Sequence, residues 1–103
     1  MENNERSYDD IKILLVEDDD IDAQGIKRAF KKQNIKNPVI RAKNGVEGLE
    51  VLRSGELTKP RIVLLDIQMP KMNGLEFLAE LRKDDALKDT VVFVLTTSKS
   101  EED

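Results

Sequence analysis

Hydrophobic residues in this chain fall into short unbroken runs, separated by longer stretches in which they recur every three or four positions. The unbroken runs cover residues 13–16, 62–65 and 91–95. Such a run cannot alternate between a buried and an exposed face, so it is typical of a parallel strand buried on both faces. The intervening spacing of three or four predicts amphipathic helices. The pattern therefore predicts alternating strands and helices.

The predicted elements are four strands and three helices. We expect strands at 11–16, 38–43, 61–65 and 91–95, and helices at 21–34, from after Asn44-Gly45 to Ser54-Gly55, and from 75 to near Asp84-Asp85. Arg41 and Lys43 make the second strand polar enough to be an edge strand. Residues 1–10 are polar and are expected to form a loose arm before a single domain. Alternation of this kind predicts an α/β fold, an open parallel sheet with right-handed crossovers.

The helices carry start signals and apolar stripes. Asp19 or Asp20 can cap the first helix, and Asn44 with Glu47 resembles a capping box for the second. Apolar residues at helical spacing mark each helix: an apolar stripe of Ala23, Ile26, Ala29 and Phe30 in the first, a stripe expected to be buried of Val46, Leu49 and Leu52 in the second, and Leu75, Leu78 and Leu81 with Phe77 in the third.

Composition narrows the available chemistry. The chain has no Cys and no His, which excludes a thiol nucleophile, a disulfide, an imidazole base and the usual zinc sites. A net charge of -4 gives no basic surface, so nucleic acid is not an expected partner. No apolar stretch approaches the ~20 residues of a membrane span, and the polar N-terminus is not a signal peptide. We therefore expect no membrane association and a cytoplasmic location.

Polar residues follow three of the predicted strands. The first strand ends in Glu17-Asp18-Asp19-Asp20, the third in Asp66, and the fourth in Thr96-Thr97-Ser98. Parallel strands end at the same edge of a sheet, where open α/β sheets bind ligands, and neighbouring strands lie ~4.8 Å apart. Carboxylates this close repel one another unless a cation lies between them. Oxygen ligands favour a hard cation such as magnesium or calcium.

Each feature also has a simpler interpretation. The run Glu17 to Asp20 could only cap a helix, and for Asp20 and Asp22 we prefer that interpretation. Asp66 could be a turn residue before Met69-Pro70. Thr96 and Thr97 could be ordinary strand residues, which we prefer for Thr97. The joint occurrence of acid, acid and hydroxyl at successive strand ends favours a functional site.

Three motifs resemble the receiver domain of two-component response regulators. They are Ile13-Leu14-Leu15-Val16-Glu17-Asp18-Asp19, the segment from Leu64-Leu65-Asp66 to Met72-Asn73-Gly74, and Val94-Leu95-Thr96-Thr97-Ser98. The resemblance covers the chain from Ile11 to its C-terminus. It implies a flavodoxin-like receiver fold with strand order 2-1-3-4. The acidic segment that runs into Asp22-Ala23, together with the run from Leu95 to Ser98, is similar to single-domain receivers that serve phytochrome-type kinases.

The resemblance implies a role for each matching residue. Asp66 would accept a phosphoryl group from a phosphohistidine of a sensor histidine kinase. Glu17, Asp18, Asp66 and the backbone carbonyl of Gln68 would hold Mg²⁺. Thr96 would be the switch hydroxyl, which bonds the phosphoryl group, and Pro70 and Gly74 would shape the loop after Asp66. The chain would then be no enzyme but a phosphoacceptor that assists its own phosphotransfer.

The sequence departs from the family pattern after the fourth strand. We expect the chain to stop at Asp103 in the first turn of the fourth helix, so that the fifth strand and the last two helices are missing. The motif lysine is absent, because Lys99 lies too close to the fourth strand, and this puts phosphorylation of the chain itself in doubt. Val91 to Leu95 would form an uncovered apolar edge. We therefore expect a fragment of a longer protein, or a homodimer or strand exchange through that edge.

Three alternative functions place different demands on the sequence. A haloacid dehalogenase type phosphatase would need an acid two residues after Asp66, where the chain has Gln68. A nucleotide-binding flavodoxin-like module would need a phosphate loop after the first strand, where the acidic run from Glu17 would repel phosphate. A receiver-like interaction module that keeps the fold and metal site without being phosphorylated remains open.

Overall fold

The computed structural model describes residues 10–66 and 74–95. In chain order the elements are β1 (Lys12–Val16), α2 (Asp20–Lys32), β2 (Val39–Ala42), α3 (Gly45–Ser54), β3 (Arg61–Asp66), α4 (Gly74–Lys83) and β4 (Val91–Leu95). Each predicted strand and helix is present, with bounds that differ by two residues at most. Of the predicted arm, residues 1–10, only residue 10 belongs to the described residues.

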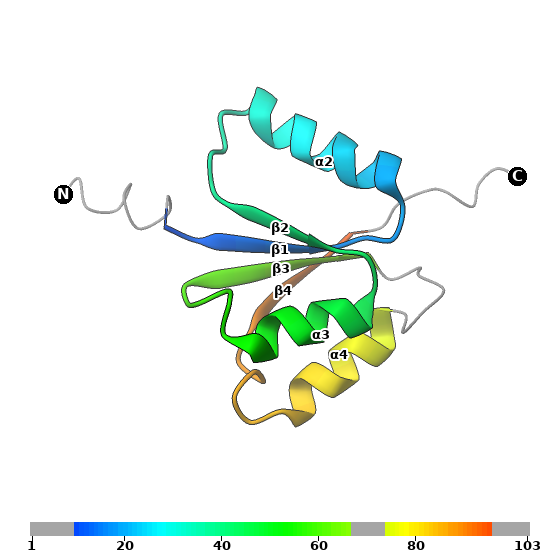
Figure 1. Cartoon of the computed structure of the whole chain (residues 1–103), viewed down its shortest axis with the longest axis vertical. Coiled ribbons are helices and arrows are strands. Elements are labelled where there is room, and N and C mark those ends of the chain that lie inside the picture. Colours follow the sequence, from blue (N-terminus) through cyan, green and yellow to red (C-terminus); the bar gives the residue numbers. More distant parts are fainter. Residues whose placement is uncertain (1–9, 67–73, 96–103) are drawn as a thin grey trace, which may run out of the picture.

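The four strands form one parallel sheet in the order β2-β1-β3-β4. This confirms the predicted order 2-1-3-4 and places β2 at one edge, as its polar residues indicated. Figure 1 shows α2 on one face of the sheet and both α3 and α4 on the other. The sheet is therefore the middle of three layers, and the ends of β1 and β3 that carry the predicted site lie at its centre.

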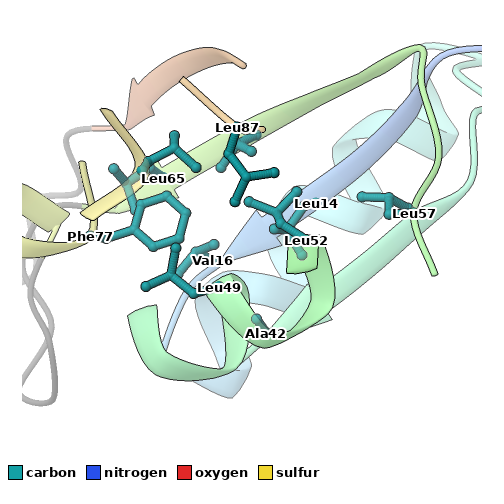
Figure 2. Packing of buried hydrophobic residues seen from close by; sticks show 11 residues of the cluster. Leu14, Val16, Ala42, Leu49, Leu52, Leu57, Leu65, Phe77 and Leu87 are labelled. Carbon is teal, nitrogen blue, oxygen red and sulfur yellow. The ribbon is translucent and has the colours of Figure 1, made fainter. Parts of the chain in front are cut away.

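The main core lies between the sheet and the pair α3 and α4. Figure 2 shows Leu14 of β1 near Leu52 of α3, Val16 of β1 near Leu49, and Leu65 of β3 near Phe77 of α4. Phe77 is completely buried. A Cβ atom added at Gly48 of α3 would lie 3.0 Å from Phe77 Cε1 and 3.1 Å from Val16 Cγ2. The helix approaches the sheet this closely because residue 48 has no side chain.

The helix ends follow their predicted signals. The Asp19 side chain accepts a hydrogen bond from the Asp22 amide at 2.9 Å and caps α2. The Asn44 side chain accepts from the Glu47 amide, and Glu47 accepts from the amide of Lys43. α3 ends at Gly55, whose φ of 81° lies in the left-handed region that glycine adopts without strain. These local signals set where the helices start and stop.

The buried stripe predicted for α3 was wrong at Val46, which is exposed, and the stripe residues Ala29 of α2 and Leu75 of α4 are exposed too. Val46 and Leu75 were chosen at a spacing of three, and in an α-helix each such step falls about 60° short of a full turn. Two steps from Leu52 or Leu81 therefore turn these side chains by about 120°, away from the core. The buried face of α4 instead combines Gly74, Phe77 and Leu81, and only Ala23 is fully buried in α2.

The outer strand β4 carries exposed apolar side chains. Val91, Phe93 and Val94 are 52%, 54% and 44% exposed, respectively. β4 pairs with β3 alone within the described part of the chain. This confirms the predicted apolar edge. Among the described helices, none is long and apolar enough to cross a membrane.

Candidate metal centre

Three carboxylates gather at the end of the two central strands. Glu17 and Asp18 directly follow β1, and Asp66 is the last residue of β3. The two strands pair with Val16 opposite Leu65, so the next positions along the sheet are Glu17 and Asp66. One oxygen from each of Glu17, Asp18 and Asp66 lies within 4.8 Å of the others. The sequence prediction that these residues meet at one edge is confirmed.

The backbone holds Glu17 firmly at the end of β1. Its amide donates to the carbonyl of Ala42 at 3.0 Å, which extends the pairing of β1 with β2 by one residue. Its carboxylate Oε2 accepts from the Asp19 amide at 3.0 Å. The Glu17 and Asp66 side chains are buried, whereas Asp18 is half-buried. Two of the three carboxylates therefore face a site with little access to bulk water.

Arg41 of β2 is a residue of this region that the sequence did not reveal. Its Nε donates to the carbonyl oxygen of Glu17 at 2.9 Å, and its Nη1 contacts Asp20 Oδ1 at 2.7 Å. The hydrogen bond from Arg41, its positive charge and the more distant charge of Lys43 lower the pKa of Asp20 below its usual value. The only signal in the sequence was a basic residue on an edge strand near an acidic loop, and we interpreted it as an edge feature alone.

The donor set fits a small hard cation. Mg²⁺ binds oxygen ligands at about 2.1 Å, which places neighbouring ligand oxygens about 3 Å apart and opposite ones about 4.2 Å apart. Oxygens that already lie within 4.8 Å of one another need only small movements to reach these separations. Buried carboxylates of like charge also gain most from a cation between them. Glu17, Asp18 and Asp66 could therefore hold a divalent metal ion.

Other predicted site residues are only partly located by the structure. Gln68, Pro70 and Thr96 lie outside the described residues. Gly74 begins α4 and is buried. Leu95 is the register partner of Asp66, which extends the same sheet edge to the end of β4.

Comparison with known proteins identifies the family. The model of the response regulator receiver domain matches residues 13–103. The chain belongs to this family. The receiver is 38% identical over 94 residues to the probable methanogenesis regulatory protein FilR2 of Methanothrix harundinacea, covering 88% of this chain and 61% of that protein. It is 37% identical over 95 residues to the response regulator Rcp1 of Synechocystis, covering 88% and 65%.

Solved structures agree with the fold of the receiver. The phosphorylated cyanobacterial phytochrome response regulator RcpA matches with a TM-score of 0.71 at 38% identity, covering 89% of this chain and 69% of that one. The Mn²⁺-bound form of Rcp1 matches with a TM-score of 0.71 at 36% identity, covering 90% and 69%. The receiver thus spans a little under two thirds of the length of the curated relatives FilR2 and Rcp1.

Proposed function

We propose that this receiver accepts a phosphoryl group on Asp66 from a phosphohistidine of a sensor histidine kinase, with Mg²⁺ as the cofactor. The observation that carries the proposal is the cluster of Glu17, Asp18 and Asp66 at the sheet edge. The 103 residues contain no His, so they cannot themselves supply the phosphohistidine. A phytochrome-type kinase is the proposed partner, because RcpA, at 38% identity, is a phytochrome response regulator.

Different residues of the chain have different roles in the phosphoryl transfer. A carboxylate oxygen of Asp66 attacks phosphorus, a P–O bond forms and the P–N bond breaks, and the electron pair of that bond returns to the histidine nitrogen. Glu17, Asp18, Asp66 and the Gln68 carbonyl are the proposed metal ligands. Bound Mg²⁺ would supply positive charge to the phosphoryl oxygens. Asp66 is 1% exposed, so its β3 position fixes the attacking oxygen and limits access of water.

Two further proposals concern the loops beside Asp66. Pro70 and Gly74 would shape the chain between β3 and α4, and Thr96 would bond the phosphoryl group. A phosphoryl group adds negative charge and three strong acceptor oxygens, enough to draw a hydroxyl group toward it. The phosphorylated state of RcpA and the Mn²⁺-bound state of Rcp1 support the acceptor and metal assignments.

The test is phosphorylation by acetyl phosphate, read by intact mass. The chain is incubated with and without Mg²⁺ beside Asp66→Asn, with Asp84→Asn as a control that removes a carboxylate remote in sequence from the cluster. A phosphate adduct is expected with the unaltered chain and the control, only when Mg²⁺ is present. An adduct that persists in Asp66→Asn would refute the assignment.

The exposed edge of β4 supports a second candidate function, association with another copy of the chain. A strand with an unpaired edge and apolar side chains offers hydrogen-bonding groups and surface to a second strand. Val91, Phe93 and Val94 supply that surface. A chain that binds metal and self-associates through β4 but forms no phosphate adduct would be an interaction module rather than a phosphoacceptor.

A further inference from the structure

Arg41 connects two points of the loop that carries two of the proposed metal ligands. Its side chain is 16% exposed and reaches from β2 to the end of β1. Nε donates to the carbonyl oxygen of Glu17 at 2.9 Å, and Nη1 contacts Asp20 Oδ1 at 2.7 Å. Asp18 lies between these two contacts in the sequence. One rigid guanidinium group therefore fixes the loop before and after Asp18.

We propose that Arg41 is a positioning residue that holds the Glu17–Asp20 loop in the geometry required for binding a divalent cation. The inference rests on the proposed function, because the cation is the one that would assist phosphorylation of Asp66. Arg41 would touch neither the cation nor the phosphoryl group. It would act through the Glu17 backbone and through Asp20, the first residue of α2.

The contacts show why one arginine suits this task. The Glu17 amide is already fixed by the Ala42 carbonyl of β2, so Arg41 fixes the other peptide group of the same residue to the same strand. Through Asp20 it also ties the start of α2 to β2. Lysine carries the same charge on a single nitrogen and cannot reproduce the planar, two-point contact. Loss of the contact would leave the loop around Asp18 held by the Glu17 amide and by the bonds of Asp19.

The positive charge of Arg41 and its role in positioning the loop predict opposite effects on cation binding when Arg41 is replaced. The guanidinium group is positive, so its charge alone opposes the binding of a second cation nearby. If charge dominated, replacing Arg41 by a neutral residue would strengthen metal binding. If position dominates, the same replacement weakens it, because ligands must be reordered when the ion binds. The direction of the change therefore separates the two effects.

The test measures Mn²⁺ affinity by electron paramagnetic resonance and Mg²⁺ affinity by calorimetry for Arg41→Lys and Arg41→Gln. Arg53→Lys is the matched control, since Arg53 Nε also pairs with an aspartate, Asp84 Oδ2, at 3.0 Å. Both Arg41 variants are expected to bind about tenfold more weakly. The control is expected to bind as the unaltered chain does.

A second readout needs no metal. Amide hydrogen exchange at Asp18 and Asp19 is expected to be faster in metal-free Arg41→Lys than in the unaltered chain, while exchange in β3 stays the same. If Arg41→Gln fails to fold, Arg41→Lys carries the test, because it keeps the charge and most of the stem. Equal affinity and equal exchange in Arg41→Lys, or tighter binding in a folded Arg41→Gln, would overturn the inference alone. Absence of metal binding by the unaltered chain would overturn the proposed function and the inference together.

Discussion

Leu95, the last residue of β4, is the register partner of Asp66, the last residue of β3. The acids at the ends of the central strands β1 and β3 therefore lie at the same edge of the sheet as the end of β4. The next residue in the chain is Thr96, which lies outside the described residues. Thr96 directly follows Leu95, the register partner of Asp66. This position supports the prediction that its hydroxyl group bonds a phosphoryl group on Asp66.

Thr96→Ala is expected to leave phosphorylation of Asp66 intact and to abolish the conformational response to it. The reason is that the methyl group cannot donate a hydrogen bond to the phosphoryl oxygens. Amide chemical shifts of β4 before and after addition of acetyl phosphate would measure the response. Thr97→Ala is the neighbouring control and should keep the response. A full response in Thr96→Ala would show that another group detects the phosphoryl group.

Two glycines in helices predict stability changes of opposite sign. Gly48→Ala places a Cβ atom 3.0 Å from Phe77 Cε1 and 3.1 Å from Val16 Cγ2. We therefore expect overpacking to lower the free energy of unfolding by about 1–3 kcal/mol. At Gly25 of α2 nothing lies within 4 Å, so Gly25→Ala should gain up to about 1 kcal/mol from helix propensity. The chain has no Trp, so urea unfolding is best followed by far-UV circular dichroism. If Gly48→Ala and Gly25→Ala changed the free energy of unfolding equally, the close packing of α3 at Gly48 would be contradicted.

Local signals explain why so much of this fold was predictable. The unbroken run from Ile62 to Leu65 is typical of a central strand, and β3 pairs on both sides. Asn44 and Gly55 set the ends of α3 through contacts within a few residues. The carboxylate cluster followed from the same logic, because parallel strands end at one edge.

The features that the sequence did not reveal depend on relationships between elements. Val46 has the same spacing of three as Leu49 and Leu52, yet it is exposed, because the face of α3 that packs on the sheet is the one that carries Gly48, Leu49 and Leu52. Arg41 lies far from both of its partners in the sequence, since its bonds to Glu17 and Asp20 span 24 and 21 positions. No periodicity encodes which loop a side chain of an edge strand will reach.

The β4 edge predicts concentration-dependent association. Val94→Lys should shift the chain toward monomer, because a charge on an edge strand opposes pairing with a second strand. Val46→Lys is the matched control, since Val46 and Val94 are 42% and 44% exposed on different elements. Sedimentation velocity over a range of concentrations measures the change. If the unaltered chain stays monomeric at all concentrations, association through this edge is refuted.

Asp84 predicts a signed dependence of stability on pH. Its carboxylate accepts from the Ala86 amide at 2.9 Å and from Arg53 Nε at 3.0 Å, and these bonds lower its pKa below 3.8 in the folded chain. A lowered pKa contributes stability above the unfolded value, and this contribution is lost as pH falls below 3.8 through the folded value. Asp84→Asn should therefore differ most from the unaltered chain at neutral pH.

The measurement for Asp84 is urea unfolding at a series of pH values from 7 to about 2. The difference in unfolding free energy between Asp84→Asn and the unaltered chain should shrink steadily below pH 3.8. Asp85→Asn serves as the control, because the Asp85 side chain is 97% exposed and such surface ion pairs add little stability. A difference that stays constant down to the lowest pH would show that the charge of Asp84 is not what stabilises the turn.

Divalent cations should stabilise the fold through the carboxylate cluster. A ligand that binds only the folded chain adds about 2.7 kcal/mol when its concentration is about 100 times its dissociation constant. Thermal unfolding with Mg²⁺, and again after excess chelator, measures this gain and its reversal. Asp18→Asn should lose most of the gain, because Asp18 is one of the three clustered acids, whereas Asp84→Asn should keep it. Equal gains in both variants would place the cation elsewhere on the acidic surface and remove the support for phosphorylation at Asp66.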